Sequence, residues 1–151
     1  LNPPEDPATF VPLAGPSVTV PEDAAMGAYL YHRKLVMVNG MHTTLAFITL
    51  VWNEMQRMMG DPGEVPGYVC EDLTLQTFNT APEEVKNDIW CWAIAQILKL
   101  MWENDEDLMR RAHGVETNRE LVEDFLAIAK LNQSRFASLD DTTARVLGGG
   151  V

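Results

Sequence analysis

The sequence has little cysteine: Cys70 and Cys91 are the only two in 151 residues. Two thiols are too few for a disulfide framework in a domain of this size, and their spacing matches neither a redox nor a zinc motif. We therefore expect free thiols in a reducing compartment, either the cytoplasm or an organelle stroma or matrix. Cys91 lies between Trp90 and Trp92 in a helical pattern, which predicts a core position, whereas Cys70 falls in a region of loop character.

Phosphate-binding and metal-binding motifs are also missing. The chain contains no G-x-G-x-x-G, no G-x-x-x-x-G-K-[ST] and no H-E-x-x-H, and the triple glycine at 148–150 lacks the strand and helix that flank a phosphate-binding loop. The acidic run 103–107 is interpreted as a solvated helix start, and a four-helix carboxylate metal site ranks last because the inward Glu-x-x-His pattern is absent. The sequence predicts no metal site and no nucleotide-binding domain within this chain.

Basic residues are scarce as well. The chain has 22 acidic and 11 basic residues, which gives a formal net charge of -11. This charge argues against nucleic acid and against an anionic membrane as partners. No uncharged apolar run reaches the length of a membrane span, so we expect no nucleic acid and no membrane span.

What is present is typical of a globular domain. Hydrophobic residues make up 46% and charged residues 22% of the 151 residues, enough for one domain with a sizeable core. Residues 1–20 contain five prolines and are interpreted as an extended arm or linker. We assign 21–140 to a helical domain and 141–151 to a flexible tail. The chain begins with Leu1, so a processed or incomplete N-terminus is expected.

Apolar residues recur at helical spacing from about Pro21 to Met59. Pro21 suits a first helical position, and Gly40 predicts a bend or break in the middle. Gly40 could leave space for a substrate or cofactor or could serve helix packing, and both interpretations stay open. A long loop is predicted over 60–80. The methionines just before it are interpreted as gap-filling core residues, namely Met55, Met58 and Met59.

Three further helices are predicted from their capping signals. Thr80 and Glu83 fit a capping box that opens a helix running to about Glu103. Residues 104–107 can cap a short helix that ends near 113–114, and Thr117 with Glu120 forms a second capping box. The predicted fold class is all-α, built on one long helix that can kink at its centre, with a proline-rich arm at the N-terminus.

Three polar residues, Lys34, Asn39 and His42, interrupt the apolar pattern of the long helix. On a regular α-helix Asn39 lies about 140° and His42 about 80° around from Lys34, so their side chains can reach one pocket. A buried lysine without a carboxylate partner has a lowered pKa that suits a general base. Asn39 and His42 can donate hydrogen bonds to one oxygen. Such a set could remove a proton from an alcohol.

A structural interpretation of the same residues stays open. Lys34 could reach solvent beside His32 and Arg33 as a basic rim. Asn39 could mark a helix break, and His42 could be a hydrogen-bonded core histidine.

A family resemblance favours the chemical interpretation. The run Lys34-Leu35-x-x-x-Asn39-Gly40-x-His42-Thr43-x-Leu45-Ala46-Phe47 resembles the signature of the C-terminal domain of the polyol-specific long-chain dehydrogenases. This is the mannitol dehydrogenase family, with its hexuronate and sugar-phosphate relatives, which carries the spacing K-x4-N-x2-H. The resemblance covers a single short stretch, and the rest of the chain agrees only in being helical and of suitable length.

The resemblance implies an oxidoreductase of two domains, with the active site between a nucleotide-binding domain and a helical substrate domain. By motif position, Lys34 would be the general base that takes the alcohol proton. Asn39 and His42 would hydrogen-bond the reacting oxygen and a neighbouring hydroxyl. Hydride would pass between a polyol or ketose substrate and NAD or NADP, held by the other domain.

The chain departs from that family because it lacks the strand and helix alternation of a nucleotide-binding domain. It is therefore not expected to catalyse hydride transfer alone. One hypothesis makes it the substrate domain of a polyol oxidoreductase, completed by a nucleotide-binding domain or another protein chain. The alternative makes it a non-catalytic interaction or assembly subunit derived from that family.

Overall fold

The computed structural model describes residues 20–59 and 73–148. Within those ranges the chain forms no strand, and one isolated antiparallel bridge joins Thr74 to Thr142. The predicted all-α fold class is confirmed. The helical elements are α1 (Ala24–Arg33), η2 (Lys34–Gly40), α2 (Met41–Met59), η4 (Leu75–Thr80), α3 (Glu83–Glu103), α4 (Glu106–His113), α5 (Asn118–Ala137) and α6 (Thr143–Leu147).

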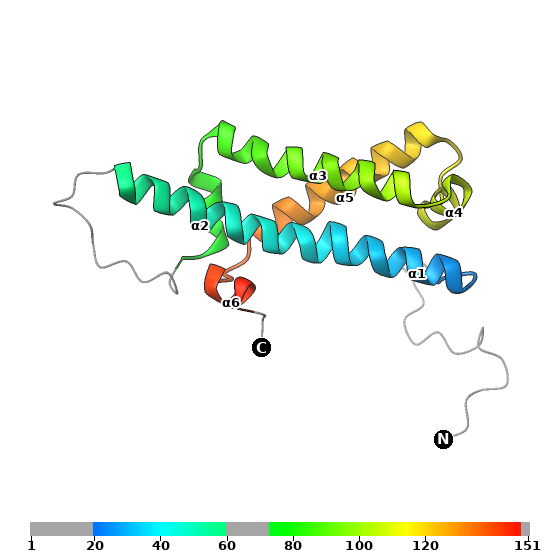
Figure 1. Ribbon diagram of the computed structural model, residues 1–151, viewed down its shortest axis with the longest axis horizontal. Coiled ribbons are helices and arrows are strands. Elements are labelled where there is room, and N and C mark those ends of the chain that lie inside the picture. The colour runs from blue at the N-terminus through cyan, green and yellow to red at the C-terminus, as the bar shows by residue number, and fades with distance from the viewer. Residues whose placement is uncertain (1–19, 60–72, 149–151) are drawn as a thin grey trace, which may run out of the picture.

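The elements α1, η2 and α2 form one continuous helix of 36 residues, Ala24–Met59, which runs the length of the molecule (Figure 1). Helix α3 lies along one side of it, α5 crosses behind, and α6 lies on the side away from α3 (Figure 1). Helix α2 contacts α3, α5 and α6, whereas α1 contacts α4. The core lies where these helices meet the long helix.

The middle of the long helix is a π-helix, η2, and does not break at Gly40. The wide turn lies between two buried side chains of the long helix, Tyr29 and Met37, which are eight residues apart. Eight residues of an α-helix turn by about 800°, which would place Met37 about 80° around the helix from Tyr29. A π-helix joins residues five apart and holds more residues in each turn, which rotates the stripe back toward the core. The buried stripe of the long helix consists of Met26, Tyr29, Met37, Met41, Leu45, Ala46 and Thr49.

Two contacts hold the wide turn in place. The buried Asn132 donates a hydrogen bond from Nδ2 to the carbonyl oxygen of Met37 at 3.1 Å, so a backbone acceptor within η2 is paired. At Gly40, an added Cβ would lie 3.0 Å from Cζ2 of Trp92. The space beside Gly40 is therefore filled by α3, as helix packing requires.

Two predicted helix starts are wrong. Helix α1 begins at Ala24 and not at Pro21, because the Asp23 side chain accepts a hydrogen bond from the Met26 amide at 2.8 Å and acts as N-cap. Helix α3 has no side-chain cap, since Thr80 belongs to η4 and donates its hydroxyl to the carbonyl of Thr77 at 2.8 Å. The predicted capping box at the start of α3 is therefore absent.

The other predicted caps are confirmed. Asp105 accepts a hydrogen bond from the Leu108 amide and begins α4. Gly114 ends α4 with a φ of 67°, a conformation that glycine adopts without steric cost. The Thr117 side chain and Glu120 form the reciprocal capping box of α5.

Several residues predicted to lie in the core are exposed. The side chains of Met55, Met58 and Met59 are 52%, 81% and 70% exposed, and the Cys91 thiol is exposed on α3. Trp102 is 90% exposed although it follows the apolar pattern of α3. These residues lie on outer helix faces that no described segment covers, which a helical pattern alone cannot reveal.

The C-terminal segment is more ordered than its assignment to a flexible tail predicts. Thr142 caps α6 by accepting a hydrogen bond from the Arg145 amide. Beside the bridge, Leu75 donates its amide to Asp141 at 2.9 Å, and Thr143 donates its amide to Leu73 at 2.8 Å. Residues 143–147 are therefore helical, while residues 1–19 of the predicted arm 1–20, Cys70 and the end of the tail lie outside the described residues.

Candidate functional site

The structure places Lys34 and Asn39 within η2 and His42 in the first turn of α2. Because a π-helix joins residues five apart, Lys34 and Asn39 lie about one turn apart on neighbouring parts of the surface, and not about 140° apart as on an α-helix. Both side chains are exposed, where the sequence suggested burial. Among the described residues, neither has a hydrogen-bond or ion-pair partner.

His42 has its own set of partners. It is half-buried, and its Nε2 lies 3.2 Å from Oδ2 of Asp141, which also pairs with Arg145. Its ring stacks on Phe136 with the centroids 4.2 Å apart. Burial lowers the pKa of His42, and the Asp141 charge partly opposes that shift. The structure therefore ties His42 to the α5 and α6 end of the fold, and a shared catalytic role with Lys34 and Asn39 stays a prediction.

A second polar cluster was not found from the sequence. His113, whose side chain is fully buried, donates from Nδ1 to Oδ2 of Asp124 at 2.6 Å. Its Nε2 then accepts the Tyr29 hydroxyl at 2.6 Å and lies 3.2 Å from Nη1 of Arg33. These contacts tie α1 to α4 and α5. Tyr29 and His113 are 84 residues apart, and no local pattern could pair them.

The order phenol, imidazole and carboxylate is that of a nucleophile, a base and an orienting group. The protonation states argue against this chemistry, because burial raises the pKa of the Tyr29 phenol and lowers the pKa of His113. Tyr29 is only 2% exposed, so a substrate has no access to its hydroxyl. We interpret the cluster as a structural link.

An apolar groove of about 190 Å³ separates α2 from the first turns of α3. Three of its side chains are among the most exposed apolar groups of α2: Phe47 at 58%, Val51 at 42% and Met55 at 52%. The indole Nε1 of Trp52, in the wall, is buried without a hydrogen-bond partner. The groove is lined by Phe47, Ile48, Val51, Trp52, Met55, Val85 and Asp88.

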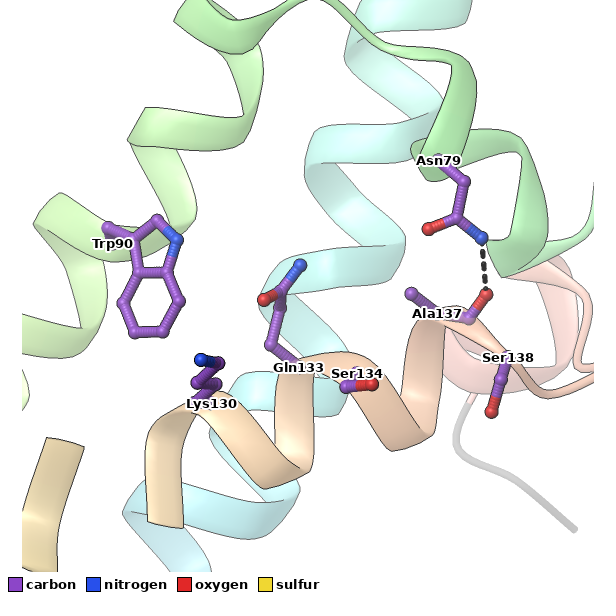
Figure 2. Close-up of a pocket in the computed structure, with 7 residues that line it drawn as sticks. All are labelled: Asn79, Trp90, Lys130, Gln133, Ser134, Ala137 and Ser138. Atoms are coloured by element: carbon purple, nitrogen blue, oxygen red, sulfur yellow. Dashed lines mark hydrogen bonds between the residues drawn. The ribbon is translucent and has the colours of Figure 1, made fainter. Parts of the chain in front are cut away.

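A second apolar cleft, of about 200 Å³, lies between α3 and α5 and is lined by Ile94, Ile97, Leu98, Met101, Val122 and Leu126. A third and larger cleft, of about 420 Å³, is polar and lies where α3, η4 and α5 meet. Figure 2 shows it between the Trp90 indole and the α5 side chains, with Asn79 on the far wall. It is lined by Asn79, Trp90, Lys130, Gln133, Ser134, Ala137 and Ser138. None of these three clefts is lined by Lys34, Asn39 or His42.

The described ranges contain no group of three or more His, Cys, Asp or Glu side chains placed to hold a metal ion. Within the same ranges, the helix Ala24–Met59 is long and apolar enough to cross a membrane by length and composition, as the core helix of a soluble protein also can be.

Comparison with known proteins gives no relative: no family model, no curated protein and no solved structure matches the chain. The resemblance to the polyol dehydrogenases therefore rests on its motif alone and stays a prediction.

Proposed function

We propose that the protein is a non-catalytic interaction subunit, and that the groove between α2 and α3 binds a basic amphipathic helix of a partner protein. The observation that carries this proposal is the exposed apolar row on α2. Phe47, Val51, Met55 and Met58 follow one another at spacings of four, four and three residues and are 58%, 42%, 52% and 81% exposed. Monomeric proteins rarely leave apolar surface of this kind contiguous and uncovered.

The composition of the groove suits a helix as its occupant. Helix-binding grooves accept apolar anchors at i, i+3, i+4 and i+7, and methionine adapts to varied side chains because it is unbranched and polarizable. Met55 supplies such a surface at the groove wall.

The negative charge of the protein favours a positively charged partner. Asp88 lines the groove, and Glu84, one turn earlier on α3, is exposed. The whole chain carries a formal net charge of -11, so it attracts basic segments and repels acidic ones, including a second copy of itself.

The test is binding of a labelled model helix of leucine and lysine, followed by fluorescence anisotropy. We expect saturable binding that weakens with added salt, and no binding of a scrambled peptide or of one with glutamate in place of lysine. Val51→Asp should weaken binding at least roughly ten-fold, because it buries an unpaired charge at the interface. Leu131→Asp, on α5 at a side chain that is 69% exposed, is the matched control.

Three outcomes would count against the proposal. They are equal binding of the basic and acidic peptides, equal effects of the two aspartate variants, and self-association in sedimentation that Val51→Asp abolishes.

The oxidoreductase domain is the second candidate, and one observation favours it. The wide turn of η2 puts Lys34 and Asn39 about one turn apart with both side chains exposed, where a separate nucleotide-binding domain with NAD or NADP could meet them. We expect NAD(P)H-linked turnover of hexitols, hexuronates or hexitol phosphates by protein isolated from its source, and its loss in Lys34→Ala. Unchanged turnover in Lys34→Ala would show that Lys34 is not the base.

A further inference from the structure

The polar cleft between α3, η4 and α5 presents an unusual combination of groups for a surface of this protein. One wall is the half-buried Trp90 indole of α3, and the floor is a single face of α5 (Figure 2). Lys130, Gln133 and Ser134 lie at i, i+3 and i+4 on that face, so they are neighbours on the helix surface. The volume of about 420 Å³ falls within the range of small-molecule sites, about 300 to 1,000 Å³.

Some of the hydrogen-bonding groups of the cleft already have partners within the protein. Asn79 donates from Nδ2 to the carbonyl oxygen of Ala137 at 2.9 Å, which fixes its amide and leaves Oδ1 as an acceptor. The hydroxyl of Ser138 is already used, since it donates to the carbonyl oxygen of Arg135 at 2.7 Å. Gln133 keeps both a donor and an acceptor, because its amide has no partner among the described residues.

Among the described residues, Lys130 is the only charged one that lines the cleft. Its ammonium has no ion-pair partner among the described residues, whereas Lys86 pairs with Glu83 and Lys99 pairs with Glu103. Lys34 is unpaired among the described residues as well, but it lines none of the three clefts. Lys130 gives the cleft a local positive charge that suits one anionic group.

We propose that this cleft binds a free purine mononucleotide, with adenine as the preferred base. A base is a flat ring that stacks on an aromatic side chain, and Trp90 offers such a face. Amide side chains pair with both a donor and an acceptor on the adenine edge, as Gln133 can. The phosphate then lies against Lys130. A polynucleotide is disfavoured, since the net charge of the chain repels its many phosphates.

The site is independent of the helix-binding groove, because the two share no lining residue. Its test therefore succeeds or fails separately from that of the proposed function.

The experiment titrates adenosine monophosphate into the full chain and follows the indole N–H resonance of Trp90, assigned with Trp90→Phe, together with calorimetry. We expect saturable binding in which Lys130→Gln lowers affinity roughly five-fold or more and removes most of the salt dependence. Gln133→Leu should reduce the preference for adenine over the pyrimidine mononucleotides. Lys99→Gln and Trp102→Leu, which lie outside the cleft, are the matched controls and should leave binding unchanged.

Ligand fragments complete the test. Adenosine without phosphate and ribose phosphate without base should each bind at least roughly ten-fold more weakly, since each lacks one of the two anchors. The proposal is overturned if ribose phosphate binds as well as the nucleotide, if Lys130→Gln and Lys99→Gln have equal effects, or if the Trp90 resonance does not move. Tighter binding of a short oligonucleotide would overturn the assignment to a free mononucleotide.

Discussion

At the scale of single residues, His113 and His42 share one physical situation. Neighbouring helices bury the His113 imidazole fully and the His42 imidazole in part, and each faces one carboxylate, Asp124 for His113 and Asp141 for His42. Burial is the largest influence on both and lowers both pKa values below the ordinary value of 6.5. The fold therefore holds both histidines neutral at pH 7.

This arrangement predicts a stability that depends on pH. Because the pKa of His113 is lower in the folded chain than in the unfolded chain, the unfolded chain binds the proton more readily. The contribution of the neutral imidazole is fully present above about pH 6.5 and is lost as the pH falls from there toward the folded pKa, by up to about 1.4 kcal/mol per pH unit. Urea unfolding between pH 7.5 and 5.5 measures this slope.

The variant His113→Gln should flatten that slope, and the part that remains should disappear when His42→Gln is added. His32→Gln is the matched control, since His32 has no ion-pair or hydrogen-bond partner among the described residues. A slope in His113→Gln as steep as in the unchanged protein would show that the stability of the fold does not depend on a neutral His113.

At the scale of elements, the wide turn η2 accepts a hydrogen bond from a side chain of another helix. Asn132 donates a hydrogen bond to the Met37 carbonyl in the interior, and Asn132→Ala removes this bond. We expect the free energy of unfolding to fall by about 1 to 3 kcal/mol and amide exchange over 37–42 to accelerate. Asn87→Ala, at an exposed site on α3, should change stability by less than about 0.5 kcal/mol. Equal losses in the two variants would contradict the role given to Asn132.

Helix ends show where local sequence suffices and where it fails. The caps at Asp105 and Thr117 were predictable because each cap and its partner lie three residues apart. The start of α3 was mispredicted because Thr80 matches the sequence pattern of a capping box. In the structure the Thr80 hydroxyl donates a hydrogen bond within η4 instead. The π-helix was not predicted either, because the hydrogen bond that its Met37 carbonyl accepts comes from Asn132, 95 residues away.

At the scale of the whole molecule, the sequence predicted an all-α fold and its main helices but not which faces would be covered. Met58 and Trp102 follow apolar patterns and are 81% and 90% exposed, because a periodic pattern specifies a face and not its neighbour. The same limit applies to the candidate sites. Lys34, Asn39 and His42 are close in the sequence and were singled out by their spacing. The polar cleft was not predicted, because it brings Asn79 to α5 through a hydrogen bond between residues 58 apart.

The bridge between Thr74 and Thr142 joins the two ends of the segment 74–142, which contains α3, α4 and α5. Backbone hydrogen bonds hold the two ends together: the Leu75 amide donates to the Asp141 carbonyl, and the Thr143 amide donates to the Leu73 carbonyl. Every residue except proline carries that donor and acceptor. Backbone groups therefore join the two ends of this segment, while the side chains at the same residues do other work: Leu73, Leu75 and Thr143 are buried, and Thr142 caps α6.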